Sequence, residues 1–382
     1  MKRLDCRYFN GYKPCGFQEE CDDSCSDYSS VLTRILVVHL EALGAVLRAT
    51  SLLPAIKRKF PKAHITWVTQ APADKLLENN PLIDRILTTH QDDLLILSAL
   101  EFDFGYCIDK SLKAVGVIQR TSVLKLYGFG ADQHGVIVPL TSSAEELWEL
   151  GLSNKKKFFE NRKAETQLMV EALELGPFQR DEYIVQLTLT ELQEVRRRRS
   201  LWSGDRKAPL VGINTGCAGT IPAKKLSIEG HRMLIRQLTK KFPHCKIVLL
   251  GGPEDDQRNR TIGKNLPVIQ SPYCSGLRDG IVSVAACDLV ISGDSLGMHM
   301  SIALKKWIVA WFGPTCDHEI DIYDRGVKVL ADVNCSPCWK RSCDATVMCY
   351  DRVNFETVCE GVEKGLQWLI SSSKPHFWEI SS

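Results

Sequence analysis

The sequence has no long hydrophobic run and no excess of either charge, and each absence excludes a class of function. No uninterrupted apolar stretch approaches the ~20 residues that a membrane-spanning helix needs. The first residues have neither the apolar core nor the small-residue cleavage site of a secretory signal. Lysine and arginine total 48 against 46 acidic side chains, so the formal net charge of +2 provides no basic field for nucleic acid. We therefore expect a cytoplasmic protein that binds no nucleic acid.

Two common nucleotide-binding motifs are also missing. Neither G-x-G-x-x-G nor the Walker pattern G-x-x-x-x-G-K-[ST] occurs, which argues against typical dinucleotide enzymes and P-loop ATPases. What is present is the composition of a globular protein, with 44% hydrophobic and 25% charged residues. A length of 382 residues favours two domains over a single core.

Apolar runs separated by amphipathic segments organise the first half of the chain. Residues 34–40 are almost continuously apolar, which is typical of a strand covered on both faces. Residues 41–44 form a predicted turn, and apolar spacings of three and four over residues 46–60 predict an amphipathic helix. The pattern predicts further strands at residues 64–69, 85–87 and 104–108. This βαβ series implies a parallel sheet.

A similar series begins again at Pro209, after a polar helical region at residues 142–175 and an alternating crossover at residues 181–189. Its predicted strands are residues 210–214, 246–250, 289–292 and 307–312. We therefore expect an α/β protein with two Rossmann-like parallel-sheet domains facing across a cleft. The expected divisions are a Cys-rich segment over residues 1–32, a first domain over 33–180, a second domain over 181–352, and a C-terminal helix over 353–382 that packs back towards the first domain.

Loops after the strands of the second half contain the groups that bind a nucleotide diphosphate. Such a ligand needs backbone N–H groups at helix N-termini, glycine for close approach, and one or two cations. Residues 214–225 form a Gly-rich loop ending in two lysines, and residues 294–299 place Ser295 and Gly297 at a helix start. Because open α/β sheets bind ligands at the carboxyl ends of their strands, we expect an anion site there.

A series of short motifs runs in order from about Thr33 to Lys364. They are ILVVHLEALG at residues 35–44, LRAT at 47–50, ENNPLIDRI at 78–86, GINTG at 212–216, AKK at 223–225, LGGPE at 250–254, Asp294 and Ser295 with Met298 and His299, and GPT at 313–315. Together they resemble glycosyltransferase family 9, the bacterial heptosyltransferases. The resemblance implies the GT-B architecture and an inverting sugar transfer, most often from ADP-L-glycero-D-manno-heptose, to a hydroxyl acceptor.

The resemblance also implies roles on the donor side. Lys224 would hold the diphosphate, and Glu254 would contact the adenosine ribose, with Asp255 as an alternative. Asp294 would orient its loop or touch the donor sugar, and His299 would either contact phosphate or pack in the core. The full implied set is Thr215, Gly216, Lys224, Glu254, Asp294, Ser295, Gly297 and His299. Enzymes of this kind use no catalytic divalent ion, because cationic side chains and helix N-termini stabilise the leaving diphosphate.

Ala45 stands where the family's first loop, which reads Leu-Gly-Asp, has its expected general base. An alanine cannot accept a proton, and three interpretations follow. The chain is an engineered inactivated variant, or a natural transferase with another base among Glu41, His39 and Asp109, or a binding-only relative. If the missing carboxylate is what limits the rate, Ala45→Asp should raise turnover at least tenfold, in line with the ~10²- to 10⁴-fold that a general base contributes.

Two cysteine groups stand out among the 15 cysteines, which a cytoplasmic chain should keep reduced. The later group has the C-x2-C-x4-C-x5-C spacing of a tetrathiolate zinc or iron site, with buried structural thiols as the alternative. The earlier group lies in a segment with almost nothing to build a core, so a structural metal is its expected cross-link. The predicted ligands are Cys335, Cys338, Cys343 and Cys349, and Cys6, Cys15, Cys21 and Cys25.

The acceptor side is expected in the first domain, at Gly44, Arg48 and Lys110. The expected acceptor is a glycolipid such as the lipopolysaccharide inner core, or a protein. Basic residues 155–157, followed by two phenylalanines, could touch the inner-membrane surface, although a solvated helix end is the simpler explanation. The alternative function is a metal-stabilised, nucleotide-sugar-binding protein without turnover. A nucleotide-sugar hydrolase or epimerase is a third option.

Overall fold

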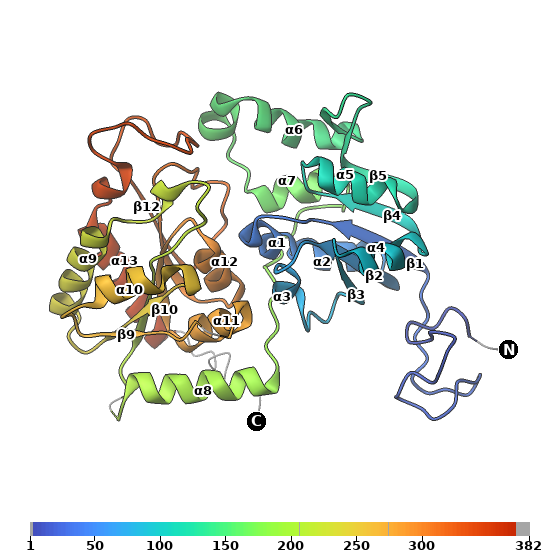
Figure 1. Cartoon of the computed structure of the whole chain (residues 1–382), viewed down its shortest axis with the longest axis horizontal. Coiled ribbons are helices and arrows are strands. Elements are labelled where there is room, and N and C mark those ends of the chain that lie inside the picture. Colours follow the sequence, from blue (N-terminus) through green and yellow to red (C-terminus); the bar gives the residue numbers. More distant parts are fainter. Residues whose placement is uncertain (1–2, 206, 274, 372–382) are drawn as a thin grey trace. The chain divides into compact units, whose positions relative to one another are not determined.

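The computed structural model describes residues 3–205, 207–273 and 275–371, which form two compact units (Figure 1). Each unit contains a six-stranded sheet. The first unit comprises Met1–Glu41, Ser51–Leu152 and Gln167–Asp181, and the second comprises Ala42–Thr50, Ser153–Thr166 and Glu182–Ser382.

The sheet of the first unit has the order β3-β2-β1-β4-β5-β6. Its strands are β1 (Thr33–Val38), β2 (Ala63–Thr69), β3 (Arg85–Thr88), β4 (Glu101–Cys107), β5 (Ser122–Ala131) and β6 (Ile137–Pro139). All neighbours pair in parallel except β6, which is antiparallel to β5. Apolar residues of the central strands and the following helices form the core, as their continuous apolar runs predict.

The sheet of the second unit repeats this order as β9-β8-β7-β10-β11-β12, and its strands are all parallel. The strands are β7 (Leu210–Asn214), β8 (Lys246–Leu250), β9 (Val268–Gln270), β10 (Leu289–Gly293), β11 (Trp307–Phe312) and β12 (Gly326–Leu330). Both orders correspond to the 3-2-1-4-5-6 order of a doubly wound fold, so each sheet has a switch point between its first and fourth strands.

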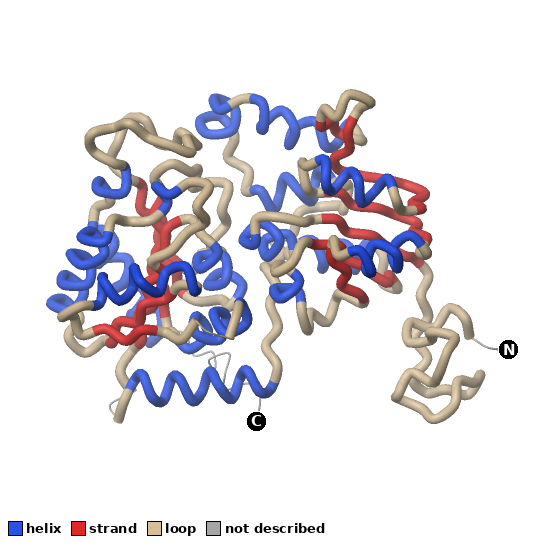
Figure 2. Tube along the Cα trace, viewed as in Figure 1, coloured by secondary structure: helices blue, strands red, loops and turns tan. Residues whose placement is uncertain are grey.

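Helices connect these strands and are visible in Figures 1 and 2. In the first part of the chain they are α1 (Leu43–Ala49), α2 (Leu52–Lys59), α3 (Asp74–Leu77), α4 (Gln91–Ser98), α5 (Leu112–Gln119), η1 (Ser142–Ala144), α6 (Glu145–Leu152), η2 (Lys156–Glu160) and α7 (Glu165–Ala172). The rest are α8 (Leu189–Ser203), η3 (Pro222–Lys224), α9 (Ile228–Lys241), η4 (Pro253–Asp255), α10 (Asp256–Gly263), α11 (Leu277–Ala286), α12 (Leu296–Ala303), η5 (Cys349–Arg352) and α13 (Phe355–Ser371).

Local sequence explains where the longer helices begin. Thr188 caps α8 in a capping box with Glu191, and the Ser227 side chain accepts a hydrogen bond from the Gly230 N–H at the start of α9. The helix predicted over residues 46–60 is divided into α1 and α2 ahead of Pro54, which lies in the first turn of α2, where proline is tolerated. No helix among the described residues is both long and apolar enough to cross a membrane.

Several parts of the chain are grouped differently from the predicted divisions, among them Ser153–Thr166, which was expected in the first domain and belongs to the second unit. Helix α13 belongs to the second unit, where Val358, Cys359 and Val362 join the core formed by β10, β11 and β12. Residues 372–382, the rest of the predicted C-terminal helix, lie outside the described residues. The segment Ala42–Thr50 also belongs to the second unit, because α1 packs against α12. Residues 3–32, the described part of the chain before β1, have no helix or strand apart from an isolated bridge between Cys6 and Ser30 (Figure 2).

Candidate functional site

The switch point of the second sheet lies between β7 and β10, where the strand order reverses. Asn214, the last residue of β7, donates hydrogen bonds from Nδ2 to Ser295 Oγ and to the Gly216 carbonyl, both at 2.9 Å. Ser295 is the N-cap of α12, and a Cβ built on Gly297 would lie 2.6 Å from Asn214 Cγ. Glycine is therefore required for α12 to begin this close to β7. The free backbone N–H groups at the start of α12 therefore lie at the switch point, where doubly wound sheets bind ligands.

Lys224 and Asp294 form an ion pair beside this switch point. Lys224 Nζ lies 2.7 Å from Asp294 Oδ2, although 70 positions separate the two residues in sequence. Burial alone would raise the pKa of Asp294, but the Lys224 ammonium outweighs it and holds that pKa below its usual value. Lys224 is thus a mostly buried cation at this sheet edge, and it is paired with the Asp294 carboxylate at the same edge.

His299 is a buried residue of α12, and its surroundings favour the core-packing role. Its ring stacks on Tyr183 with centroids 6.0 Å apart, and a Cβ on Gly44 would lie 2.3 Å from its Cδ2. Burial, and secondarily the Arg48 charge, lower the pKa of His299 to about 3, so the ring is neutral at physiological pH. Gly44 is therefore needed for α1 to approach α12, which explains why this loop contains glycine.

A second corner of the same sheet edge forms where β8 enters η4. The Asp255 carboxylate is buried against the Gly216 backbone, so a Cβ on Gly216 would lie 2.0 Å from Asp255 Oδ2. Burial, and to a smaller extent Glu254, raise the pKa of Asp255. Thr215 is also buried and donates a hydrogen bond to Asn259. Glu254 is exposed, so it is the carboxylate of this corner that a ligand can reach.

The later cysteine group lies next to the Lys224 segment. Helix η5, which begins at Cys349, contacts η3, which ends at Lys224. The pKa of Cys349 is raised to about 11, first by burial and then by the neighbouring thiols of Cys338, Cys343 and Cys335. The fold therefore brings the four predicted ligands into one neighbourhood.

Metal-ligand geometry in the described chain appears at another position. Cys316, Asp317 and His318 have ligand atoms within 4.8 Å of one another, whereas neither predicted cysteine group converges to that degree. His318 Nε2 is already 2.9 Å from the Phe158 carbonyl and 2.9 Å from Arg162, so this ring has protein partners. The four N-terminal cysteines are partly buried in the loop segment before β1.

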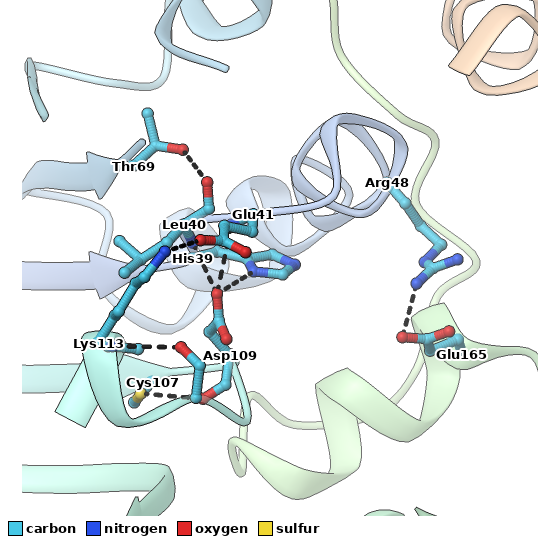
Figure 3. Close-up of polar contacts among 11 residues, drawn as sticks. His39, Leu40, Glu41, Arg48, Thr69, Cys107, Asp109, Lys113 and Glu165 are labelled. Atoms are coloured by element: carbon cyan, nitrogen blue, oxygen red, sulfur yellow. Dashed lines mark hydrogen bonds and ion pairs between the residues drawn. The ribbon is translucent and has the colours of Figure 1, made fainter. Parts of the chain in front are cut away.

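The switch point of the first sheet has a histidine and an aspartate (Figure 3). His39 and Asp109 follow β1 and β4, and His39 Nδ1 lies 3.6 Å from Asp109 Oδ2. The same oxygen accepts hydrogen bonds from the backbone N–H groups of Leu40 at 3.0 Å and Glu41 at 3.4 Å. Burial would raise the pKa of Asp109, but these partners lower it to about 2. Asp109 is therefore ionised at neutral pH.

The other residues of the first loop and α1 differ in charge, in burial and in their ion-pair partners. Glu41 is exposed and paired with Lys113, and no acidic residue lies in the first turn of α1, which contains Ala45. Arg48 is buried and lies 2.6 Å from Glu165 (Figure 3). Burial works against its charge, but Glu165 raises the pKa of Arg48 above its usual value. Arg48 is thus a structural cation of the second unit.

Lys110 and a nearby cavity complete the first unit's carboxyl edge. Lys110 Nζ donates to the Leu147 carbonyl at 2.7 Å and lies 4.6 Å from the centre of the Phe129 ring. The cavity, of about 580 Å³, has an apolar wall that includes Leu94 and Val117, and Lys113 and Arg120 provide its cations. Sequence patterns did not point to this cavity, because its lining comes from the loops that follow β2 and β3 and from α4 and α5, through residues without a shared motif.

Comparison with known proteins places these features in context. The sequence model of glycosyltransferase family 9 (heptosyltransferase) matches residues 101–348. Lipopolysaccharide heptosyltransferase 1 of Campylobacter coli is 21% identical over 355 residues, which cover 87% of this chain and 98% of that protein.

Solved structures share the fold. A family 9 glycosyltransferase from Veillonella parvula aligns with a TM-score of 0.70 and 17% identity, covering 88% of this chain and 98% of that one. ADP-heptose lipopolysaccharide heptosyltransferase II of Escherichia coli aligns with a TM-score of 0.66 and 18% identity, covering 88% and 100%. The iron-containing dodecameric glycosyltransferase TibC of E. coli aligns with a TM-score of 0.53 and 14% identity, covering 89% and 77%. The two-sheet architecture expected from the sequence is thereby confirmed as that of the GT-B heptosyltransferases.

Proposed function

Because the chain belongs to glycosyltransferase family 9 (heptosyltransferase), we propose that it transfers a heptose from ADP-L-glycero-D-manno-heptose to a hydroxyl acceptor with inversion. The observation that supports this most directly is the Lys224–Asp294 pair beside the α12 N-terminus. Lys224 supplies a cation, and the start of α12 supplies backbone N–H groups and glycine at the same sheet edge. These are the groups that a nucleoside diphosphate requires.

In this proposal the diphosphate and the ribose of the donor bind at neighbouring positions along the carboxyl edge of the second sheet. The diphosphate contacts Lys224, Ser295 and the α12 N–H groups, and the ribose contacts the exposed Glu254 at the end of β8. Asp255 is excluded from the ribose role because its carboxylate is buried against Gly216. As the sugar–phosphate bond breaks, negative charge grows on the leaving diphosphate. A preorganised cation and helix N-terminus then stabilise the transition state more than the bound substrate.

Asp109 is the group we assign as proton acceptor for the attacking hydroxyl. It is ionised, it accepts a hydrogen bond from the Leu40 N–H, its carboxylate faces His39 Nδ1 at 3.6 Å, and it lies at the first sheet's switch point. Glu41 is less suitable, because it is exposed and its charge is shared with Lys113. With Asp109 as the base, alanine at position 45 is compatible with turnover, and the chain need not be an inactivated variant.

Ala45→Asp separates this assignment from the interpretation that the base is missing. If Asp109 accepts the proton, the new carboxylate should leave kcat within about twofold of the unsubstituted chain, because the ~10²- to 10⁴-fold contribution of a base is already present. The measurement is the steady-state rate of ADP release with heptose donor and acceptor. A rise of tenfold or more would contradict the Asp109 assignment and show that position 45 limits turnover. Ala45→Asn, which has similar size without the charge, is the matched control.

For the acceptor we propose an anionic glycolipid such as the lipopolysaccharide inner core. Support comes from the cavity of the first unit, where apolar residues and the cations of Lys113 and Arg120 suit a charged sugar. The C. coli protein, which is similar over 98% of its length, is a lipopolysaccharide heptosyltransferase by name. The alternative is a protein acceptor, and contact with the inner-membrane surface from the cytoplasm would bring the enzyme to a glycolipid.

The later cysteine group has the donor chemistry of a structural zinc or iron site, although no three of its sulfur atoms lie within 4.8 Å of one another in the structure. Its donor set is four thiols, which both ions accept, and the fold brings them close enough for three of them to raise the pKa of the fourth. A bound cation would stabilise the deprotonated thiolates and would therefore lower the pKa of Cys349 again. The iron-containing TibC is a solved structure of the same fold. We propose the ion as a structural component and assign it no step in the transfer.

Cys338→Ser should remove roughly one ion per chain, since a tetrathiolate site that loses one ligand binds far more weakly. Cys21→Ser tests the N-terminal group in the same way. The measurement is elemental analysis of purified protein, expressed as metal per chain. Cys245→Ser is the control, because Cys245 stands outside both groups and burial raises its pKa to about 11. Equal metal content in Cys338→Ser and Cys245→Ser would contradict the proposal that the later cysteine group binds a metal ion.

The proposed function itself is tested by incubating the protein with labelled ADP-heptose and candidate acceptors. Transfer of label to the glycolipid supports the proposal. Release of free heptose would instead show a hydrolase, and unchanged donor that co-elutes with the protein would show a binding protein. The absence of any binding would contradict both the proposed function and the donor site.

A further inference from the structure

Trp339 projects from the cysteine-rich loop towards two lysines of the second unit. Lys157 Nζ lies 4.4 Å from the centre of its ring and Lys224 Nζ lies 5.7 Å from it, both within the ~6 Å range of cation–π contacts. Each ammonium also has a carboxylate partner, Glu319 for Lys157 and Asp294 for Lys224. The indole is nevertheless 40% exposed, so much of its surface is available to a ligand.

Backbone contacts hold this ring in place. The N–H groups of Cys338 and Trp339 both donate to the Pro314 carbonyl, at 3.1 and 2.8 Å. Cys349 packs against Gly313, because a Cβ built on Gly313 would lie 2.8 Å from the Cys349 Sγ. The loop is therefore attached to the turn that follows β11. An exposed tryptophan positioned by backbone hydrogen bonds and flanked by cations is unlike a residue placed for core packing.

The order of strands indicates which part of the donor would meet this ring. Along the carboxyl edge, β8 is followed by β7, β10 and β11. The proposed ribose contact, Glu254, follows β8, and the proposed diphosphate contacts lie at the β7–β10 switch point. In a nucleotide sugar the diphosphate joins the ribose to the sugar, so a donor bound in an extended conformation places its sugar on the side of the diphosphate away from the ribose. That direction leads to β11 and to the Pro314 turn on which Trp339 is anchored.

We propose that Trp339 is the surface on which the sugar of the nucleotide-sugar donor packs, an inference that rests on the proposed function of Lys224 in binding the diphosphate. A sugar ring presents a face of C–H groups that packs well on an aromatic ring, and ligand sites are lined mainly by such apolar surfaces. The cysteine-rich loop thereby becomes part of the donor site, because it positions a ring that contacts the substrate.

The test compares the affinities of ADP and ADP-heptose for the full chain by calorimetry. Trp339→Ala should weaken ADP-heptose binding at least about fivefold, as expected for one lost aromatic contact, and change ADP binding less than about twofold. Trp339→Phe, which keeps a ring, should retain most of the ADP-heptose affinity. Metal per chain and the melting temperature are measured for each variant, and both should match the unsubstituted protein.

Every other outcome overturns the proposal. Equal weakening of ADP and ADP-heptose would show that Trp339 acts only by holding Lys224, which is a structural role. Unchanged affinities would show that the sugar does not meet the ring. A loss shared by Trp339→Phe and accompanied by metal release would assign the effect to the loop. If the unsubstituted chain binds neither ligand, the proposed function fails first, and this failure is visible before any substitution is made.

Discussion

Replacing Asp109 by asparagine is expected to lower kcat by ~10²- to 10⁴-fold, the range that loss of a general base produces. The amide oxygen can still accept the hydrogen bond from the Leu40 N–H, so the local fold should persist. It cannot accept a proton from the attacking hydroxyl. ADP affinity should remain within about twofold, because the proposed donor contacts belong to the second unit. The measurements are single-turnover transfer rates and calorimetric ADP binding.

Asp103→Asn is a closely matched control for this substitution. Asp103 Oδ2 accepts the Arg34 N–H at 2.7 Å, so it links β4 to β1 as Asp109 does, but at the opposite, amino edge of the sheet. Its replacement should leave kcat unchanged and reveal any general cost of losing such a link. A large loss of rate in Glu41→Gln, with normal activity in Asp109→Asn, would contradict our assignment and identify Glu41 as the base.

Sequence patterns predicted the central strands of both sheets and the edge strand β3, and missed β5, β6, β9 and β12. The run at residues 34–40 is almost continuously apolar and the run at 307–312 is fully apolar. They form β1 in the centre of the first sheet and β11 beside the central strand β10 of the second. In contrast, β9 and β12 are partly exposed edge strands with short or mixed sequences. Strand β5 was also missed, because its first half is mostly exposed and contains Ser122 and Lys125 among the apolar residues. Burial on one face only leaves a weaker signal in the sequence.

The candidate site shows a similar division between what local sequence specifies and what tertiary packing decides. Glycine and serine at strand ends predicted the α12 N-terminus, because turn chemistry is local. The partners of charged residues could not be predicted, since Arg48 pairs with Glu165 across more than a hundred positions. For His299 the sequence left phosphate contact and core packing open, and burial against Tyr183 favours packing. Trp339 was overlooked, although its position next to Cys338 was a usable signal.

Lys224→Ala is expected to weaken ADP binding by about 10- to 100-fold, since a hydrogen bond to a charged group contributes ~1.5–3 kcal/mol. Calorimetry with ADP and with ADP-heptose measures the effect, and both affinities should fall together because both ligands contain the diphosphate. Lys240→Ala is the control, because Lys240 is an exposed lysine near the end of α9 in the same unit. A loss of affinity in Lys225→Ala with none in Lys224→Ala would transfer the role to the neighbouring lysine.

Stability must be separated from binding in this experiment, because removing Lys224 leaves Asp294 without the cation that lowers its pKa. An unpaired, nearly buried carboxylate should cost ~1–3 kcal/mol of unfolding free energy. The double variant Lys224→Ala with Asp294→Asn removes that charge, so its melting temperature should recover towards that of the unsubstituted chain. ADP affinity should stay low, because the cation is still absent. Recovery of ADP binding together with stability would show that Lys224 only maintains the fold, and the diphosphate would then need another cation.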